Sequence, residues 1–439
     1  MLDNRTQKYA DTFAELIRMD TTSYDEQPDK TVFYQFYKLL KEKFPHIFSV
    51  VEYEDFSGSF LLKWKGESDQ APILLMNHQD VVVATGDWRF PPFSAEIADG
   101  KIWGRGVIDD KGGLWAMLQA ADELASEGFV PTRDIYFMST CTEEQTGIGA
   151  DIISAALKEK GIRFEMVLDE GGMIVSEPIA GAVGKYAMVG VGEKGCVNLK
   201  FTARSEGGHA STPESNTPLV RLGKFMAEVE NGKQFKSEVS PTVCTTFNCL
   251  SRGMKGPVKL LLKNAKFFKG LLSIVLPKIS AAAGAMLKTT IAFTMCSGST
   301  ESNVLPENAW VLGDMRYSHH QGSKESIRVI TEIAKKYNIE TEIVSPVFDS
   351  PISDIDSNAF KTVKRAIEKI FPDTVTTPYI MLGASDSRYL SRVCDNCIRF
   401  SPFTIDNEQL DSVHAVNENI DLSCLAPAVD FYRLIITEA

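Results

Sequence analysis

The chain has 439 residues, 44% of them hydrophobic, and a formal net charge of −12. This length allows two domains with a large buried core, and the negative charge argues against a protein that binds nucleic acid. No apolar run is long enough to span a membrane, and the first residues lack the pattern of a signal peptide. We therefore expect a cytoplasmic protein with no nucleic-acid partner.

The first half of the chain predicts alternating strands and helices. Apolar residues recur at helical spacing near 9–17 and 32–40, which indicates two amphipathic helices. The elements expected after them are strands at 48–53, 59–64 and 73–83, a helix at 112–128, a strand at 135–138, a helix at 147–160 and a strand at 164–168. Such alternation is typical of an α/β fold with a mostly parallel central sheet and helices on both faces.

The pattern changes near residue 195, where apolar and polar residues alternate and predict a strand with one solvated face. We interpret residues 195–316 as an inserted, smaller α+β domain, and 1–194 with 317–439 as the discontinuous main domain. The elements expected from here on are a helix at 219–229, a strand ending at Arg316, a helix at 327–334, a strand at 339–345, a helix at 358–371 and a final helix from 426.

Polar side chains gather where the strands of the main domain are predicted to end. Seven of them lie at or just past strand ends, or in the loops beside them: His78, Asp80, Asp109, Glu143, Glu144, Asp169 and Glu170. Open α/β sheets bind their ligands at that edge. Several carboxylates converging there would repel one another unless something positive joined them, and a pair of divalent metal ions is the simplest solution.

Two pairs among these residues suggest distinct tasks. His78 and Asp80 are two residues apart, so in an extended chain their side chains point the same way. An imidazole that binds a metal usually donates its other N–H to a carboxylate, although a loop histidine near a charge is the plainer interpretation. Glu143 and Glu144 are adjacent, so their side chains diverge, and one can face a metal while the other faces a substrate.

The eight cysteines offer little to a metal. Only Cys394 and Cys397 have metal-like spacing, and no second pair of this kind completes a structural zinc site. We therefore predict free thiols. A histidine-based site must draw on only six histidines.

Seven segments, taken together and in order, resemble one family. They are HQDVV, GRGVIDDKGG, CTEEQTG, LDEGG, GGHAS, GASDSRY and HAVNE. The family is that of the co-catalytic zinc exopeptidases and amidohydrolases, which includes ArgE-type deacetylases, DapE-type desuccinylases, aminoacylases and carboxypeptidase S. The resemblance covers nearly the whole chain, and LKTTIAFTMCSGSTESNVLPENAW is most similar to the carboxypeptidase S branch. It implies a zinc-exopeptidase-like catalytic domain with an inserted lid or dimerisation domain.

The resemblance implies a set of metal ligands. His78 would bind one of two zinc ions, with Asp80 orienting it, and Asp109 would bridge both ions, while Asp110 occupies a variable position. The remaining ligands would be Glu144, His414 and a carboxylate from LDEGG. That carboxylate is Asp169 or Glu170, depending on the branch used for alignment, and the aminoacylases favour Glu170.

The resemblance also implies how substrate is handled. Glu143 would be the general base, and His209 would reach the active site of a partner subunit and stabilise the oxyanion, which implies a homodimer through the inserted domain. Asn303, Arg316 and Arg388 would hold a substrate carboxylate, a task that suits a guanidinium because it binds carboxylates bidentately. The plainer interpretations are a surface loop for His209 and ordinary salt bridges for the arginines.

These inferences combine into a hypothesis: a two-domain dizinc hydrolase that cleaves an amide bond next to a substrate carboxylate. Short peptides are the expected substrates, which makes a carboxypeptidase or dipeptidase. The alternative with the same chemistry is an N-acyl-amino-acid deacylase. Cobalt or manganese could replace zinc, because His and carboxylate ligands accept them. A non-catalytic scaffold would have lost a ligand or the base, whereas every motif position here holds a competent residue.

One stretch stands apart from the motifs. Residues 241–300 contain eight basic residues and no acidic one. Their lysines could join Phe267, Phe268, Leu271, Leu272 and Ile274 in a basic amphipathic helix that attracts a membrane or a long acyl chain. The plainer interpretation is a lid helix with a solvated lysine face and a packed apolar face, and with it we expect no membrane contact.

Overall fold

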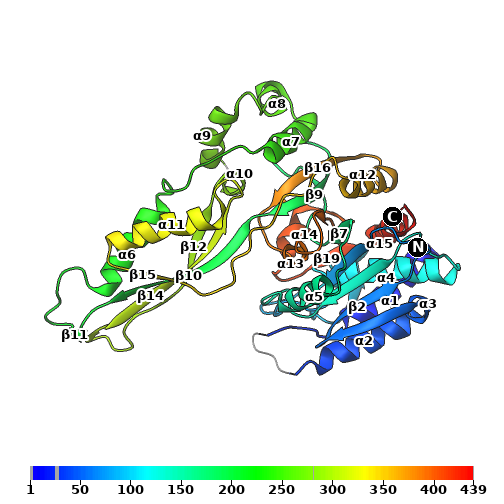
Figure 1. The fold of residues 1–439 in the computed structure, drawn as a ribbon, viewed down its shortest axis with the longest axis horizontal. Coiled ribbons are helices and arrows are strands. Elements are labelled where there is room, and N and C mark those ends of the chain that lie inside the picture. Colours follow the sequence, from blue (N-terminus) through cyan, green and yellow to red (C-terminus); the bar gives the residue numbers. More distant parts are fainter. Residues whose placement is uncertain (1–2, 25–28, 280, 439) are drawn as a thin grey trace.

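The computed structural model describes residues 3–24, 29–279 and 281–438. Two sheets organise these residues, a large one on the right of Figure 1 and a smaller one on the left, and both termini lie on the side of the large sheet. In this described part of the chain, no helix is long and apolar enough to cross a membrane.

The large sheet has ten strands, in the order β1-β2-β6-β3-β7-β17-β9-β8-β18, with β16 also paired to β9. The strands are β1 (Val51–Phe56), β2 (Ser59–Trp64), β3 (Ile73–His78), β6 (Ile135–Thr140), β7 (Met166–Asp169), β8 (Ile174–Ser176), β9 (Lys185–Glu193), β16 (Thr374–Met381), β17 (Cys397–Arg399) and β18 (Thr404–Ile405). At its centre, β3 runs parallel to β6 and β7, and β17 runs parallel to β7. The carboxyl ends of these strands therefore meet at one edge, as the sequence predicted.

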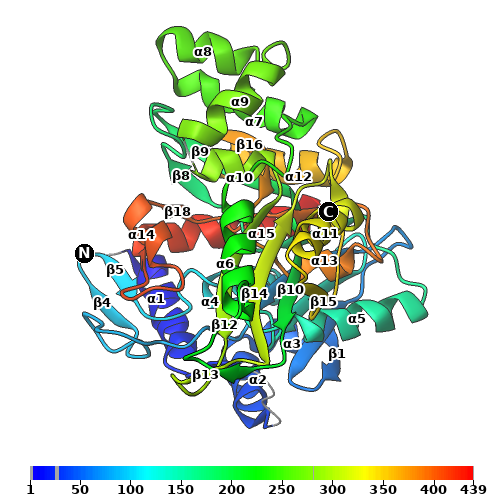
Figure 2. The ribbon, with the colours of Figure 1, turned by 90° about the vertical axis from the view of Figure 1, so that its left-hand side faces the viewer.

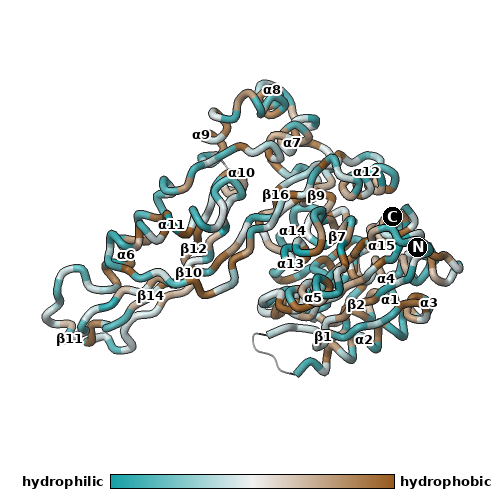
Figure 3. Tube along the Cα trace, viewed as in Figure 1, coloured by the Kyte–Doolittle hydropathy of each residue, from teal (hydrophilic) through white to brown (hydrophobic). Residues whose placement is uncertain are grey.

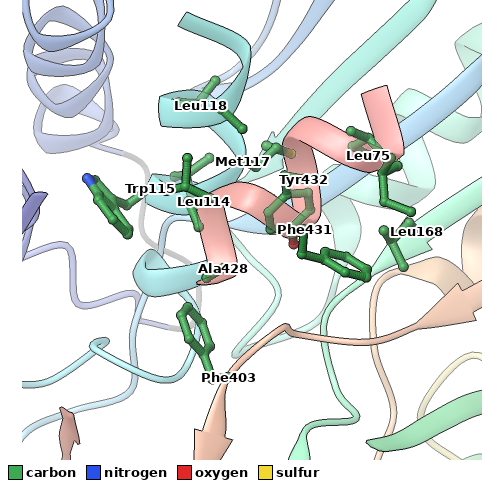
Figure 4. Packing of buried hydrophobic residues seen from close by; sticks show 14 of the residues in the cluster. Leu75, Leu114, Trp115, Met117, Leu118, Leu168, Phe403, Ala428, Phe431 and Tyr432 are labelled. Atoms are coloured by element: carbon green, nitrogen blue, oxygen red, sulfur yellow. The ribbon is translucent and has the colours of Figure 1, made fainter. Parts of the chain in front are cut away.

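Helices cover both faces of this sheet. They are α1 (Asn4–Ile17), α2 (Thr31–Lys43), α3 (Pro45–Val50), α4 (Lys111–Ser126), α5 (Ile148–Glu159), α12 (Asn358–Ile370), α13 (Ser387–Leu390), α14 (Asn407–Ser412) and α15 (Leu425–Glu438). Successive strand side chains point to opposite faces, so Leu75 of β3 packs with α4 and α15 while Leu74 packs with α5. Figure 4 shows the first of these layers, where Leu114 of α4 and Phe431 of α15 meet the sheet. Burial on both faces explains why β3 is continuously apolar.

The small sheet has the order β12-β14-β10-β15. Its elements are β10 (Gly195–Arg204), α6 (Pro218–Glu230), β12 (Thr290–Ser297), β14 (Asn308–Tyr317), α11 (Gly322–Lys336) and β15 (Glu340–Ile343). Leu199 and Phe201 of β10 share one core with Phe225 of α6 and Ile330 of α11. This unit therefore extends beyond the expected end at 316, because β15 pairs with β10 and α11 packs beneath it.

Three smaller groups complete the fold. The helices α7 (Pro241–Leu250), α8 (Gly256–Lys263) and α9 (Lys269–Ile279) stand at the top of Figure 2, and α10 (Ala281–Leu287) lies lower, near β9 and β16. A two-stranded ribbon of β11 (Gly208–His209) and β13 (Val304–Leu305) forms the far tip of the small-sheet unit (Figure 1). A three-stranded sheet joins β4 (Glu96–Ala98), β5 (Lys101–Trp103) and β19 (Asn419–Asp421).

Most predicted elements are confirmed, with shifts of a few residues. The strand expected at 48–53 is wrong in its first half, since the short helix α3 occupies Pro45–Val50 and β1 begins only at Val51. Pro45 at the first position of α3 has the fixed φ that a helix start favours. The strand expected at 73–83 ends at His78. Cys394 and Cys397 are both buried and form no disulfide.

Candidate metal centre and active site

The predicted site residues of the main domain come together at the carboxyl edge of the large sheet. His78 ends β3, Asp169 ends β7, and Glu143 follows the end of β6 at Thr140. Asp109 lies in the loop before α4, and its peptide bond to Asp110 is cis. Three neighbouring parallel strands thus deliver side chains to one place.

Asp109 is the centre of the cluster. Its Oδ1 lies 2.9 Å from Nε2 of His78, and its Oδ2 lies 3.0 Å from Nε2 of His414. The same His414 nitrogen is 3.1 Å from Oε2 of Glu144. Ligand atoms of His78, Asp109 and Glu144 all lie within 4.8 Å of one another. Each oxygen of one carboxylate thus faces a different imidazole, which is the arrangement that a carboxylate shared by two metal ions requires.

The backbone selects which nitrogen His78 presents. Nδ1 lies 2.9 Å from the carbonyl oxygen of Asp80 and 3.6 Å from that residue's carboxylate. Because Nδ1 faces this carbonyl, Nε2 is the nitrogen that faces Oδ1 of Asp109, and it is the atom that would bind a metal once it carries no proton. The predicted orientation of His78 by residue 80 therefore runs through the backbone carbonyl, with the carboxylate farther away.

The Asp80 carboxylate holds the loop that carries the two glutamates. Its oxygens accept the backbone N–H groups of Glu143 and Glu144, both at 3.2 Å, and the hydroxyl of Ser23 at 2.8 Å. Gln145 donates to the carbonyl of Ser23 at 3.0 Å and ties the same loop a second time. Asp80 thereby fixes where both glutamates begin.

The cluster carries more negative charge than its own histidines balance. Burial, against the opposing charge of His78, raises the pKa of Glu143 well above its usual range, and the charges of Asp386 and Glu144 raise it further. Burial also raises the pKa of Glu144. For Asp109, burial would raise the pKa, but hydrogen bonds with His414 and His78 hold it well below its usual value. A cation would relieve this crowding.

The donors fit a divalent metal on two further grounds. Imidazole nitrogens and carboxylate oxygens are the ligands that zinc accepts in catalytic sites. Oε1 of Glu144 is buried without a hydrogen-bond partner among the described residues, and a buried polar atom left unpaired is costly. The residues present therefore fit a metal centre, with His78, Asp109, Glu144 and His414 as its nearest donors.

The two candidates in LDEGG face different surroundings. Oδ2 of Asp169 accepts the backbone N–H of Ser387 at 2.8 Å, at the start of α13. Burial raises the pKa of Glu170 well above its usual range, and the negative charges of Asp109 and Asp110 raise it further. Asp169 is thus engaged by the backbone, whereas Glu170 faces the metal cluster.

The structure places His209 and Asn303 together, although the sequence gave no reason to pair them. His209 pairs with Val304 across the β11–β13 ribbon, and the backbone carbonyl of Asn303 accepts the N–H of Ala210 at 2.9 Å. Both side chains are exposed at the tip of the small-sheet unit, far from the metal cluster of the same chain (Figure 1). Nδ1 of His209 contacts the hydroxyl of Ser211 at 2.7 Å.

The two arginines differ in their availability. Arg316 is bound bidentately by Asp314, at 2.7 and 3.0 Å, so a salt bridge of its own strand already occupies it. Arg388 stacks on the ring of Tyr389, 4.8 Å from its centroid, and forms no ion pair among the described residues. Arg388 is therefore the better candidate to receive a substrate carboxylate.

Three buried charges were missed as site residues. Glu418 accepts hydrogen bonds from Arg105 at 2.7 Å and from the backbone of Gly106 and Ile108 at 2.9 and 2.7 Å. Glu418 lies four residues after His414, and its partners lie just before Asp109. This pairing therefore connects the loop of His414 to the loop of Asp109. The signal was present in the motifs, because Arg105 stands inside GRGVIDDKGG and Glu418 ends HAVNE.

Asp386 is the remaining missed residue. Oδ2 accepts the hydroxyl of Thr140 at 2.5 Å, and Oδ1 is buried without a hydrogen-bond partner among the described residues. Burial raises the pKa of Asp386 to about 7, against the opposing charge of Arg388. It stands behind Glu143 and contributes to the raised pKa of that residue.

An α/β domain whose strand ends gather histidines and carboxylates, with a second sheet unit inserted beside it, defines a metal-dependent hydrolase. The chain belongs to peptidase family M20/M25/M40, whose profile matches residues 74–438. The family resemblance expected from the seven segments is thereby confirmed.

Curated relatives fall into two functional groups. The chain is 31% identical over 441 residues to "Probable carboxypeptidase S-like 2" of Dictyostelium discoideum, covering 97% of this chain and 83% of the relative. It is 29% identical over 433 residues to the human "N-fatty-acyl-amino acid synthase/hydrolase PM20D1", covering 96% of this chain and 86% of the relative. The similarity to carboxypeptidase S is confirmed.

Solved structures share the fold at low identity. The M20 family metallo-carboxypeptidase Sso-CP2 from Sulfolobus solfataricus matches with a TM-score of 0.71 at 17% identity, covering 98% of each chain. Human carnosine dipeptidase 1 matches with a TM-score of 0.69 at 15% identity, covering 99% of this chain and 96% of the other. These matches confirm the predicted α/β class.

Proposed function

We propose that this chain is a dinuclear metal hydrolase that cleaves an amide bond beside a free carboxylate, acting as a carboxypeptidase or dipeptidase on short peptides. One observation carries the proposal: the two oxygens of Asp109 face the ring nitrogens of His78 and His414. Family membership and the name of the carboxypeptidase S-like relative support it.

Two metal ions, in the simplest case Zn²⁺, would be held around Asp109. His78 and Glu170 would serve one ion, Glu144 and His414 the other, and Asp109 both. Asp169 is the alternative to Glu170, because the backbone N–H of Ser387 occupies only its Oδ2 and ligating carboxylates commonly accept such bonds. When bound, the ions supply Lewis acidity that activates water and polarises the scissile carbonyl. Cobalt or manganese would suit the same donors.

Glu143 would be the general base. It would take a proton from the attacking water and deliver it to the leaving amine nitrogen. A positioned general base typically contributes about 10²–10⁴-fold in rate. Its position supports this role, because Glu143 lies in the same loop as the metal donor Glu144 and Asp80 accepts the backbone N–H of both residues.

Arg388 would receive the substrate carboxylate, and the tip residues His209 and Asn303 would complete the site from a second subunit. The position of the tip supports this idea, because the side chains of His209 and Asn303 are exposed and lie far from the metal cluster of their own chain (Figure 1). A homodimer through the small-sheet unit follows from the proposal. Arg316 would act indirectly, since Asp314 already binds its guanidinium.

The eight free cysteines suit a reducing compartment, which supports the expected cytoplasmic location.

A second candidate is hydrolysis of N-acyl amino acids. A cavity of about 310 Å³ lies beside the catalytic loop, between Gln145 and Thr146 of that loop and the apolar side chains of Phe56, Ile148 and Ile152. The apolar side chains on one wall of this cavity, which Thr142 of the same loop also lines, would suit part of an acyl chain. The name of the human relative supports this reading.

A substrate panel with a chelator control tests both candidates. The panel contains Gly-Xaa dipeptides, blocked peptides, and N-acetyl, N-succinyl and long-chain N-acyl amino acids. Chelator-sensitive cleavage of dipeptides supports the peptidase, whereas cleavage of one acyl class alone assigns the second candidate. No turnover of any member by a metal-loaded protein would contradict both.

The variant Glu143→Gln tests the general base. We expect turnover to fall by about 10²–10⁴-fold while metal content stays unchanged, because the direct contacts of the donor cluster involve Glu144 rather than Glu143. The exposed variant Glu408→Gln is the matched control. Near-normal turnover in Glu143→Gln would remove the proposed role.

A further inference from the structure

The helices α7–α10 contain a surface that the catalytic proposal does not use. They interrupt the small-sheet unit between α6 and β12 and protrude from the top of the molecule in Figures 1 and 2. We call the outer face of α8, α9 and the turn between them the helical cap surface. It consists of Val258, Leu260, Phe267, Phe268, Leu271 and Ile274, with the lysines 255, 259, 263 and 266 around them.

These helices have one apolar face that is already packed. Leu262, Ala265 and Leu272 are buried against Phe247 of α7 and Tyr186 of β9. This packing agrees with the plainer interpretation of the sequence, a lid helix with a packed apolar face. It accounts for the inner face of the helices and leaves the outer one unexplained.

The helical cap surface is a second apolar face, and it lies open. The exposed fractions are 84% for Phe267, 64% for Leu260 and 60% for Ile274. A shallow groove between α8 and the following turn is lined by Pro257, Val258, Leu260, Leu261, Asn264 and Phe268. The tube in Figure 3 shows brown apolar segments alternating with teal ones along α8 and α9. Exposed apolar patches of this kind mark interaction sites more often than chance.

The charges around the surface have one sign. Lys255, Lys259, Lys263 and Lys266 are exposed, and none of them pairs with a carboxylate in the described parts of the chain. Residues 241–300 contain no acidic residue, although the whole chain carries a net charge of −12. A partner for this surface must therefore be apolar where it touches the aromatic rings and negative around them.

We propose that the helical cap surface docks on an anionic lipid bilayer, with Phe267, Leu260 and Ile274 entering the interface and the lysines contacting headgroups. Basic amphipathic helices that lie in the interface plane combine these two features. Anionic leaflets attract such lysines within about a Debye length. The protruding position of α8 and α9 lets a flat surface reach them (Figure 2).

A second copy of the chain fits this surface less well. A twofold interface presents the same patch on both subunits, so it would bring lysines against lysines with no carboxylate from 241–300 between them. An acidic peptide would meet the charge but would leave the exposed Phe267 ring without an apolar partner. The charge and the apolar side chains together favour the bilayer.

Flotation of the full-length, metal-loaded protein with vesicles tests the proposal. We expect binding to phosphatidylcholine vesicles containing 30% phosphatidylglycerol at low salt, at least about fivefold weaker binding to phosphatidylcholine alone, and a clear loss at 0.5 M NaCl. Absence of flotation with the anionic vesicles, or equal flotation with both compositions, would overturn the proposal.

Two variants separate the apolar and the charged contributions. Lys263→Glu/Lys266→Glu should weaken binding by at least about tenfold, because each basic residue near an anionic surface contributes appreciably, and Phe267→Ser/Ile274→Ser should weaken it by at least about fivefold. The matched controls are Lys38→Glu/Lys41→Glu on α2, which makes the same charge change on exposed residues elsewhere, and Val130→Ser at an exposed valine. The controls should bind like the wild type. Unaltered binding in both test variants would contradict the assignment to α8 and α9.

The other occupants are distinguished by two measurements on the same proteins. If Phe267→Ser/Ile274→Ser lowers the mass of the particle in solution and no variant binds vesicles, the surface belongs to a second copy and the proposal is wrong. If a polyglutamate peptide binds while anionic vesicles do not, an acidic polypeptide replaces the bilayer. Hydrolase activity on soluble substrates should be the same in all four variants, so a failure here leaves the proposed function untouched.

Discussion

The carboxyl edge of the large sheet and the helical cap surface differ in whether their charged groups are buried and paired. At the sheet edge, charged groups of both signs are buried and most contact one another, as Asp109 does with His78 and His414. On the cap, charges of one sign and apolar rings face outward without partners. The proposals assign metal ions to the first region and a lipid surface to the second.

The largest effect should come from breaking the centre of the sheet edge. Asp109→Asn keeps the shape of the side chain but removes the charge that both imidazoles face. We expect turnover to fall by at least about 10³-fold, because metal catalysis is worth several kcal/mol, together with loss of bound metal by elemental analysis. Asp87→Asn, at an exposed aspartate, is the control. If Asp109→Asn retained its metal and its activity, Asp109 would not be the residue that holds the metal centre.

A smaller effect should follow from loosening the support behind the edge. Glu418→Gln removes the negative charge that Arg105 and the 106–109 backbone bind. Groups that orient metal ligands typically change metal affinity or activity by about 10–100-fold, so we expect a loss in that range, measured as metal affinity and kcat. Glu408→Gln, at an exposed glutamate of α14, should leave both unchanged. Equal behaviour of the two variants would show that the support is dispensable.

The smallest effect concerns the junction between β9 of the large sheet and β10 of the small sheet, which we call the hinge. Nζ of Lys194, between β9 and β10, donates to the carbonyls of Ala285 and Lys288 at 3.1 and 2.9 Å, which ties the end of α10 to the hinge. Burial lowers the pKa of Lys194 to about 7. Above that pH the folded protein loses a proton that the unfolded chain keeps, so this group makes the free energy of unfolding rise with pH between 7 and about 10.

Lys194→Met should remove that rise. Between pH 7 and 8.5, we expect the wild type to gain about 1–2 kcal/mol more stability than the variant, measured by urea unfolding at both pH values. Lys185→Met on the same β9, where the lysine is exposed, should retain the rise. If the free energies of unfolding of Lys194→Met and the wild type rose equally with pH, the lowered pKa of Lys194 would be contradicted.

Much of the sheet edge could be predicted because its signals are local. His78 and Glu144 follow the ends of parallel neighbours, and Asp109 lies in a polar loop beside them, so the sequence predicts one site for all three. The choice between Asp169 and Glu170 could not be made locally. The surroundings of Asp169 include the backbone N–H of Ser387, which is 218 residues away in the sequence.

The remaining differences also arise from long-range contacts. The inserted unit was expected to end at 316, but β15 pairs Ile343 with Leu199 across the small sheet, and no local pattern near 340 indicates that partner. The support of Asp109 by Glu418 is of the same kind, as is the pairing of His209 with the chain around Asn303. The outer face of α8 and α9 could not be told from the inner one, because both are apolar at helical spacing and only packing decides which is covered.

The most direct test of a shared Asp109 counts the metal ions that restore activity. Chelator-treated protein is titrated with Zn²⁺ or Co²⁺ while dipeptide and N-acyl amino acid hydrolysis is followed. Two equivalents per chain should restore full turnover, and Glu143→Gln should bind the same number without turnover. Full activity without metal, or saturation at a single equivalent, would contradict the dinuclear centre.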